Sequence, residues 1–310
     1  MTPIRIEGLT KVFHVGLGWP RRVVTVLDHL DLEVHQGEIF GFLGPNGAGK
    51  TTTIKLLLGL LMPTAGQAWL LDQEIGDVAS KRQIGFLPES PYFYEYLTGE
   101  EFLTFYGQLF GLNGTGLART VDRLLDMVRM DEARRLPLRK FSKGMLQRIG
   151  LAQALINDPQ VVILDEPMSG LDPIGRREVR DLILRLKDQG KTIFFSTHIL
   201  PDVEMICDRV AILVKGKLRA VGAIHDLVGA SAVTSVEAVV EGLSDVAVLE
   251  ATGLGGAVIQ RGAQAMVTLP DERAVPALLA LLVRQGGRLV SLTPHKRSLE
   301  DLFVTEVGRT

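Results

Sequence analysis

Two periods of hydrophobic residues divide the chain into strand-like and helix-like segments. Apolar or nearly apolar runs, which are typical of strands covered on both faces, occur at residues 39–43, 161–164, 192–195 and 210–214. From 98 to 155 the apolar residues recur instead at spacings of three and four, which predicts helices. Because helical segments also separate the apolar runs, we predict an α/β fold with a parallel or mixed core sheet. A helical subdomain at about 91–155 is inserted into it.

Alternating patterns predict further elements near the start of the chain. Polar residues interrupt the apolar ones at 4–9, residues 23–27 are mostly apolar, and apolar and polar residues alternate at 30–34, which predicts three short strands. A helical pattern follows at 50–61, directly after the apolar run at 39–43. We therefore expect a strand, a short loop and a helix in succession around residue 45.

After about residue 222 the order of elements changes to that of a small α+β domain. Strands are predicted at 233–240, 257–261, 265–269 and 288–292, and helices at 245–251 and 274–285. Strand, helix, strand, strand, helix and strand is the order of a ferredoxin-like domain. We therefore divide the chain into domains at 1–225 and 226–310. The second domain can bind a regulatory ligand, stabilise a dimer or pack on the sheet, and we favour the dimer role.

Composition and charge exclude several functional classes. The 310 residues include 34 Lys and Arg against 36 Asp and Glu, so no global basic field favours nucleic acid, and we expect no such partner. Cys207 is the only cysteine, which excludes an internal disulfide and favours a reducing compartment. No apolar stretch approaches the roughly 18 residues of a membrane span, and charges near the N-terminus argue against a cleaved signal peptide. We expect a cytoplasmic protein.

Residues 44–51 read GPNGAGKT and have the spacing of a phosphate-binding loop. They follow a predicted buried strand and precede a predicted helix, which is the context that this motif requires. Glycines let the backbone approach a polyphosphate, Lys50 reaches the β and γ phosphates, and the Thr51 hydroxyl is a ligand for Mg²⁺. The segment therefore predicts a nucleotide site. Its predicted nucleotide-binding residues are Gly44, Pro45, Asn46, Gly47, Ala48, Gly49, Lys50, Thr51 and Thr52.

Two adjacent acids, Asp165 and Glu166, end the apolar strand at 161–164. Asp165 is placed to hold Mg²⁺, through water, as expected for a phosphate-loop enzyme. Glu166, one residue further, is the candidate general base that polarises the attacking water. Two acids at a strand end are ordinary structure in many proteins. The phosphate loop upstream favours the catalytic interpretation here.

A segment just before these acids resembles a known family. The sequence FSKGMLQRIGLAQAL at 141–155 is similar to the signature segment of ATP-binding-cassette (ABC) ATPases, and Ser142 and Gly144 match its serine and one of its glycines. The resemblance extends over about residues 1–225. It implies a P-loop NTPase fold and the ATP-hydrolysing subunit of an ABC transporter, with ATP and Mg²⁺ as ligands. It further implies a head-to-tail homodimer, in which Ser142 and Gly144 of one subunit contact ATP on the phosphate loop of the other.

Other motifs of that family occur in the expected order. Residues 169–172 (SGLD) resemble its D-loop, and His198 follows a predicted strand as its switch histidine does. The resemblance implies that His198 contacts the γ-phosphate and that Phe13 stacks on adenine. Glu89 stands where the family has the glutamine of its Q-loop. A carboxylate still accepts a hydrogen bond from a Mg²⁺-bound water, so Glu89 is a candidate catalytic and metal-binding residue, with Thr51 and Asp165 as further metal ligands.

Two further segments bear on the partners. All four tyrosines fall between Tyr92 and Tyr106. Tyrosines can pack locally or anchor an interface, and in the family this region receives a short helix of the transmembrane partner, which favours partner contact. The segment SLEDLF at 298–303 resembles the ending of ATPase subunits from export systems. The resemblance thus implies an exporter subunit, held on the cytoplasmic face of the cell membrane by transmembrane permease subunits.

The alternative is a soluble ABC ATPase that acts on ribosomes or nucleic acid. Such proteins usually have two cassettes in one chain or long coiled-coil arms. This chain has one cassette and no sustained heptads, so we favour the transporter subunit.

Overall fold

The computed structural model describes residues 2–16, 22–228, 233–242, 258–296 and 298–308. These residues form two compact units, Met1–Ile224 and His225–Thr310. No helix of the described residues combines the length and the apolar character that a membrane span needs.

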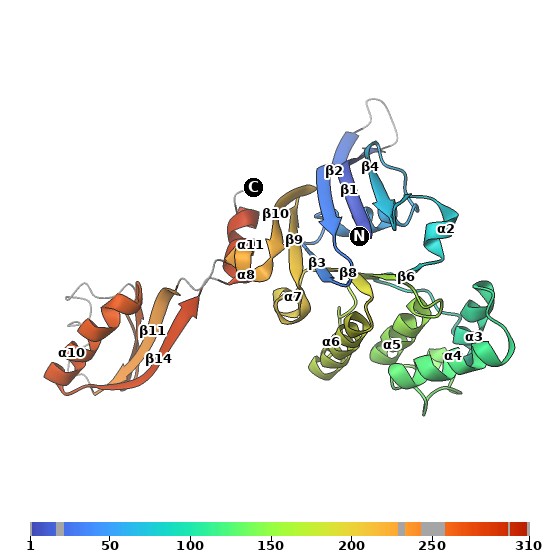
Figure 1. Ribbon diagram of the computed structural model, residues 1–310. Helices are drawn as coiled ribbons and strands as arrows, with labels where there is room; N and C mark the ends of the chain where they lie inside the picture. Colours follow the sequence, from blue (N-terminus) through green and yellow to red (C-terminus); the bar gives the residue numbers. More distant parts are fainter. Residues whose placement is uncertain (1, 17–21, 229–232, 243–257, 297, 309–310) are drawn as a thin grey trace. The chain divides into compact units, whose positions relative to one another are not determined.

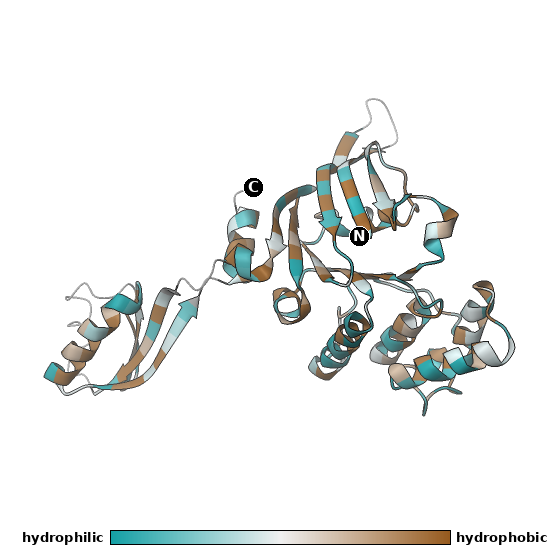
Figure 2. Ribbon diagram, viewed as in Figure 1, coloured by the Kyte–Doolittle hydropathy of each residue, from teal (hydrophilic) through white to brown (hydrophobic). Residues whose placement is uncertain are grey.

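A four-stranded antiparallel sheet with the order β2-β1-β4-β5 occupies the start of the first unit (Figure 1). Its strands are β1 (Ile4–Val15), β2 (Arg22–Val34), β4 (Ala65–Leu70) and β5 (Gln73–Glu74). The two predicted strands at 23–27 and 30–34 are one continuous strand, β2, since His29 takes a left-handed conformation (φ 51°) without ending the pairing to β1. Figure 2 shows apolar and polar residues alternating along β1 and β2, which leaves one face of this sheet for the core.

The second sheet of this unit has six strands in the order β10-β9-β3-β8-β7-β6. Its strands are β3 (Ile39–Leu43), β6 (Ile84–Leu87), β7 (Val161–Asp165), β8 (Thr192–Thr197), β9 (Arg209–Val214) and β10 (Lys217–Ala223). All neighbouring pairs are parallel except β9 and β10. The predicted α/β fold class with a mixed core sheet is confirmed. The register pairs Leu43 with Thr197 and Asp165 with Ser196, so the chemistry-bearing ends of β3, β7 and β8 lie at one edge.

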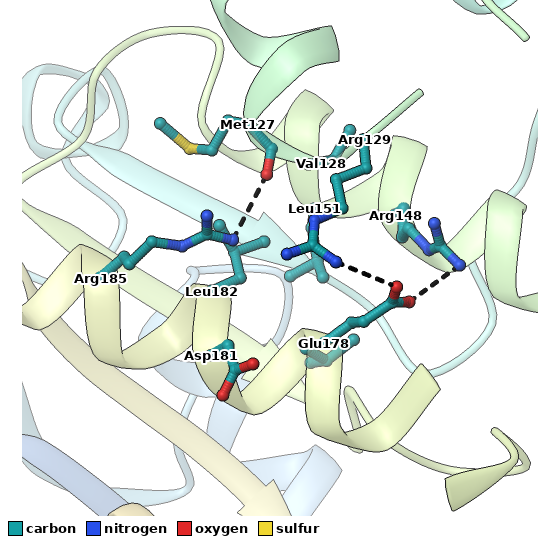
Figure 3. A pocket seen from close by; sticks show the side chains of 10 residues that line it. Met127, Val128, Arg129, Arg148, Leu151, Glu178, Asp181, Leu182 and Arg185 are labelled. Atoms are coloured by element: carbon teal, nitrogen blue, oxygen red, sulfur yellow. Dashed lines mark hydrogen bonds and ion pairs between the residues drawn. The ribbon is translucent and has the colours of Figure 1, made fainter. Parts of the chain in front are cut away.

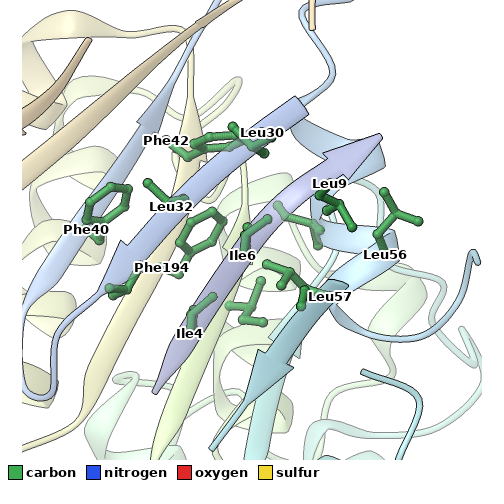
Figure 4. Packing of buried hydrophobic residues seen from close by; sticks show 14 of the residues in the cluster. Ile4, Ile6, Leu9, Leu30, Leu32, Phe40, Phe42, Leu56, Leu57 and Phe194 are labelled. Atoms are coloured by element: carbon green, nitrogen blue, oxygen red, sulfur yellow. The ribbon is translucent and has the colours of Figure 1, made fainter. Parts of the chain in front are cut away.

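The two sheets share one hydrophobic core. Residues of β1 and β2 pack against Phe40 and Phe42 of β3, Phe194 of β8 and the leucines of helix α1 (Lys50–Leu57) (Figure 4). The rings of Phe40 and Phe194 are stacked with their centroids 5.9 Å apart. Burial also raises the pKa of the Cys207 thiol well above its usual range, so this side chain stays neutral beside β3.

Helix α1 ends four residues earlier than the pattern at 50–61 predicts. Gly59 adopts a left-handed conformation (φ 63°) and its N–H donates to the Leu56 carbonyl at 2.9 Å, while Leu60 N–H donates to the Lys55 carbonyl at 2.8 Å. These two hydrogen bonds form a Schellman motif, which closes a helix. The glycine that ends the helix was visible in the sequence.

Helices cover the six-stranded sheet, and a group of them extends from its β6 side (Figure 1). That group consists of α3 (Gly99–Leu109), α4 (Gly114–Met127), the short η1 (Leu138–Lys140) and α5 (Lys143–Ala154). Besides α1, the described part of this unit contains the helices α2 (Val78–Lys81), α6 (Pro173–Asp188) and α7 (Leu200–Ile206). Thr98 and Glu101 form a capping box that fixes the start of α3. Within this group, α5 packs against β6.

The second unit contains a four-stranded antiparallel sheet with the order β12-β13-β11-β14. The strands are β11 (Val233–Glu241), β12 (Val258–Arg261), β13 (Gln264–Leu269) and β14 (Arg288–Lys296), and the other elements are α8 (Ile224–Val228), η2 (Glu272–Ala274), α10 (Val275–Gln285) and α11 (Leu299–Gly308). Leu278 and Leu282 of α10 pack on one face of the sheet, against Val236, Ala238 and Val240 of β11. The predicted helix at 245–251 lies outside the described residues.

Candidate nucleotide-binding and catalytic site

The loop at 44–49 joins β3 to α1 in a conformation that requires glycine. Gly47 and Gly49 have φ values of 78° and 112°, a region that other residues rarely adopt. A Cβ on Gly44 would lie 2.4 Å from the Leu213 carbonyl oxygen of β9, which is closer than any real contact. The loop is held by a hydrogen bond from Gly44 N–H to Thr197 O (3.3 Å) and another from Gly216 N–H to Ala48 O (2.9 Å). The backbone is thus pinned to β8 and to the turn after β9.

Lys50, the first residue of α1, is buried and fully partnered within the chain. Its Nζ donates to Gly44 O at 2.7 Å and to Pro45 O at 3.4 Å. The same nitrogen lies 3.2 Å from Glu166 Oε1, and both side chains are only 6% exposed. An ammonium has three donors. A phosphate that takes one of them must therefore displace one of these oxygens.

Glu166 connects Lys50 to His198. The second carboxylate oxygen, Oε2, lies 2.9 Å from His198 Nδ1, and the histidine side chain is 43% exposed. Glu166 has a left-handed backbone (φ 50°), and its N–H donates to Ser196 Oγ at 3.1 Å. This conformation follows the end of β7 directly and is uncommon for a residue with a side chain. It holds the carboxylate between the lysine and the histidine.

Ser196 of β8 orients both acids at the end of β7. Its hydroxyl donates to Asp165 Oδ1 at 2.5 Å and accepts the hydrogen bond from Glu166 N–H. Asp165 is buried. Ser196 was not predicted as a site residue. The signal for it is the parallel pairing of β7 with β8, which places residue 196 opposite residue 165.

A hollow of about 420 Å³ lies over the loop, which is within the range of small-ligand sites. It is lined by Val26, Pro45, Asn46, Gly47, Ala48, Gly49, Lys50, Thr51, Thr52, Glu89 and Glu166. Two glutamates, Glu89 just after β6 and Glu166 just after β7, thus face the same space as the phosphate loop. Val26 of β2 was not predicted, and its place on a half-buried strand gave no signal.

Comparison with known proteins places this site in a family. Residues 27–169 match the ABC transporter domain family. An ABC transporter ATP-binding protein of Nostoc sp. is 44% identical over 308 residues, which is 99% of this chain and 90% of the relative. The chain belongs to the ABC transporter ATP-binding family. It is an ATP-binding subunit and an ATPase, as the signature segment implied.

Another relative of this ABC subunit has a more specific name. The fluoroquinolones export ATP-binding protein of Mycobacterium tuberculosis is 35% identical over 308 residues, which is 99% of this chain and 93% of the relative. A solved ATP-binding subunit of an ABC transporter is 32% identical and covers 73% of this chain and 92% of its own length, with a TM-score of 0.64. The resemblance stated from the motifs is thereby confirmed.

The two signature residues of the ABC subunit lie apart from its own hollow. Ser142 caps α5, where its Oγ accepts a hydrogen bond from Met145 N–H at 3.3 Å, and it is exposed, as is the neighbouring Lys143. Neither Ser142 nor Gly144 lines the space over residues 45–52. Within the described residues, the Lys143 ammonium has no hydrogen-bonding or ionic partner. It lies over Gly170, 2.0 Å from where a β-carbon would be.

Phe13 also lies outside the lining of the hollow. It is half-buried on β1, opposite Val24 of β2, and the Lys11 ammonium lies 4.9 Å from the centre of its ring. Its face is therefore already covered by a cation. The predicted stacking on adenine stays a prediction.

The oxygen donors around the hollow suit Mg²⁺ but do not form a preformed cage. No group of three or more His, Cys, Asp or Glu side chains able to hold an ion occurs in the described parts of the chain. Thr51 and Glu89 line the hollow, and the buried Asp165 keeps one oxygen that accepts no hydrogen bond from Ser196. A hydroxyl and carboxylates are ligands that Mg²⁺ accepts together with substrate phosphates. The donor set fits such an ion.

The pair of Lys50 with Glu166 predicts a competition that ADP binding can measure. We expect Glu166→Gln to raise the affinity for ADP about fivefold. The phosphate then displaces a neutral amide from Lys50 instead of a carboxylate, and the amide is the weaker partner by about 1 kcal/mol. Glu89→Gln is the matched control. It removes the same charge from the lining of the same hollow, whereas the ion pair of Lys50 is with Glu166. Equal gains in the two variants, measured by calorimetry, would show a simple charge effect and contradict the competition.

Proposed function

We propose that this ABC subunit powers export, as a homodimer bound to transmembrane permease subunits on the cytoplasmic face of the cell membrane. The observation that carries the proposal is the buried pair of Lys50 and Glu166, joined to His198, at the end of a phosphate loop. Support for export comes from the relative named as a fluoroquinolones export ATP-binding protein and from the ending at 298–303. The soluble alternative has no observation in its favour.

The residues around the hollow act on ATP in distinct ways. The backbone N–H groups of the loop at 46–49, together with Thr52, hold the phosphates, and Lys50 neutralises the β and γ phosphates. Glu166, freed from Lys50 when the phosphate takes its place, is the general base that polarises the attacking water. His198 contacts the γ-phosphate and keeps Glu166 oriented through Nδ1. Phe13 stacks on the adenine after moving with β1, or after Lys11 leaves its face.

Thr51, Glu89 and Asp165 would hold Mg²⁺. The ion supplies positive charge that neutralises the charge developing on the phosphates. Ser196 keeps the Asp165 carboxylate pointing at the edge where β3 and β7 end. Glu89 adds a negative charge where the family has an amide, and this strengthens the hold on a divalent ion.

Residues that a single chain leaves unused support the proposed homodimer. Ser142 and Gly144 lie at the start of α5, away from the hollow of their own chain. In a head-to-tail pair they complete the site of the other copy. We further propose that the chain divides into domains at 1–225 and 226–310, with the helical subdomain at about 91–155, and that the C-terminal domain stabilises this pair. The two compact units and the strand order of the second support the division.

An exposed group of tyrosines is the proposed contact with the permease. Tyr92 and Tyr96 are 85% and 70% exposed, and Tyr94 lies between them with its ring edge-on to Phe105 of α3. Exposed aromatic side chains on a packed base are typical of an interface. Tyr92 and Tyr96 are thus the proposed contacts with the partner, whereas Tyr94 packs locally. Both roles considered from the sequence, interface and local packing, occur within this group.

Co-purification tests the proposed function. The full-length chain is tagged and purified from detergent-solubilised membranes and from the soluble fraction, and its companions are identified by mass spectrometry. We expect a multi-spanning membrane protein that alters the ATPase rate, and loss of that companion in a Tyr92→Ala, Tyr96→Ala variant. Ribosomal proteins or nucleic acid as the main companions would contradict the proposal and favour the soluble alternative.

A further inference from the structure

A partly buried carboxylate on α6 joins two arginines of the helical subdomain (Figure 3). Glu178 Oε2 lies 2.9 Å from Arg148 Nη2 of α5, and Glu178 Oε1 lies 3.5 Å from Arg129 Nη1, just after α4. The side chains of Arg148 and Glu178 are 27% and 23% exposed, whereas that of Arg129 is largely in solvent. The pair of Arg148 with Glu178 is therefore the stronger of the two, since less water screens it.

Packing beneath these charges makes the contact specific. Leu151 of α5 and Val179 and Leu182 of α6 are buried around the same small hollow. Arg185, two turns further along α6, reaches the Met127 carbonyl at the end of α4, at 3.5 Å. Three contacts thus connect α6 to α5 and to the end of α4, above an apolar floor (Figure 3). Sliding one helix along the other would break these contacts together.

Arg129 departs from the usual choice of residue at the end of a helix. Its φ of 55° is left-handed, and glycine is the common residue directly after a helix in this conformation. The left-handed conformation is unfavourable for an arginine, but the side chain of Arg129 makes an ion pair with Glu178. Local rules broken at one position often mark a site where another requirement is met. Here that requirement is a second cation for Glu178.

Helices α5 and α6 both begin near residues of the proposed ATP site. Helix α5 starts after Ser142, and α6 starts after Asp172, whose Oδ1 accepts a hydrogen bond from Gly175 N–H at 2.8 Å. Gln147, the neighbour of Arg148, is buried and donates to Pro167 O at 2.8 Å, one residue after Glu166. This hydrogen bond and the adjacent pair of Arg148 with Glu178 together hold α5, which begins after Ser142, against the segment that follows Glu166.

We propose that Glu178 is a positioning residue for ATP hydrolysis: it holds the signature residues at the start of α5 in register with the catalytic end of β7. This inference rests on the proposed function, because it requires that Ser142 and Gly144 act on ATP bound to a second copy. Without the carboxylate, Arg129 and Arg148 face each other with no counter-charge, and the helical subdomain loses its preferred position on α6. Nucleotide binding by the phosphate loop of the single chain stays intact.

Glu178→Gln in the full-length chain tests this role. We expect kcat to fall roughly 3- to 30-fold, the range of variants that alter coupling without touching a ligand, while KM changes little. The affinity for ADP and the unfolding temperature should stay close to those of the wild type. Lys187→Gln is the matched control, because Lys187 lies on the same helix and pairs with Asp208 at 2.5 Å, away from the helical subdomain. A kcat for Glu178→Gln equal to that of the control overturns the inference.

A charge exchange separates positioning from general stability. In an Arg129→Gly background, Glu178→Arg alone should lower kcat, and adding Arg148→Glu should restore it, since the pair is rebuilt with its charges reversed. Failure of the added change to restore kcat overturns the inference, also where Glu178→Gln proves too unstable to assay. A parallel loss of ADP affinity and of folding in Glu178→Gln, without restoration by the exchange, shows a structural role only.

The proposed function can fail separately. If the wild type hydrolyses no ATP, or if Ser142→Ala leaves kcat unchanged, the trans-acting signature is wrong and this inference falls with it. If Ser142→Ala lowers kcat but Glu178→Gln matches Lys187→Gln, only the role of Glu178 is wrong.

Discussion

Glu166→Gln is expected to lower the rate of ATP hydrolysis by about 10²- to 10⁴-fold while ATP still binds. The carboxylate lies 3.2 Å from Lys50 and 2.9 Å from His198, at the end of β7. An amide has the same shape and can still hydrogen-bond to the lysine and the histidine, so the site keeps its geometry. It cannot take a proton from water at neutral pH. Phosphate release measures the rate, and calorimetry measures the binding of ATP.

Glu89→Gln is the control for that experiment, because it changes the other carboxylate of the same hollow into the amide that the family has there. We expect the Glu89 variant to lose much less activity than the Glu166 variant. Near-normal turnover in Glu166→Gln would contradict its assignment as the general base. A large loss in Glu89→Gln alone would transfer that assignment to Glu89.

The phosphate loop and the acids could be predicted because each depends on a few consecutive residues. The backbone at Gly44, Gly47 and Gly49 leaves no room or no favourable conformation for a side chain, so the glycines in the sequence indicate the loop directly. A fully apolar strand with acids at its end also predicts a buried parallel strand whose end faces a site. The α/β fold followed from the same runs.

Contacts between segments that are distant in the sequence could not be predicted from such local patterns. The chain from Lys50 through Glu166 to His198 depends on the register of β3, β7 and β8 and on the left-handed turn at Glu166. The pair of Arg148 with Glu178 depends on how α5 packs on α6, and surface charges on helices rarely reveal their partners in the sequence. Phe13 shows the same limit. The resemblance to the family implies that Phe13 stacks on adenine, but only the folded sheet shows that Lys11 covers its ring.

Lys50→Ala is expected to weaken ADP binding at least about 30-fold, since truncating one partner of a buried, hydrogen-bonded charge pair costs about 2–5 kcal/mol. The lysine is the first residue of α1, and its ammonium lies among the Gly44, Pro45 and Glu166 oxygens at the floor of the hollow. Without it the phosphates would meet the Glu166 carboxylate with no cation between them. Calorimetry with ADP measures the loss in the isolated subunit, so no second copy or membrane partner enters the result.

Two companion variants make the result of Lys50→Ala interpretable. Lys55→Ala removes an exposed lysine from the last turn of the same helix and should leave ADP binding unchanged. Lys50→Ala combined with Glu166→Gln removes the carboxylate that the first change leaves buried and unpaired, and it should recover folding stability and part of the affinity. If the double variant binds ADP no better than Lys50→Ala, the repulsion from Glu166 is not what weakens binding. If Lys50→Ala binds ADP as the wild type does, Lys50 does not hold the phosphates.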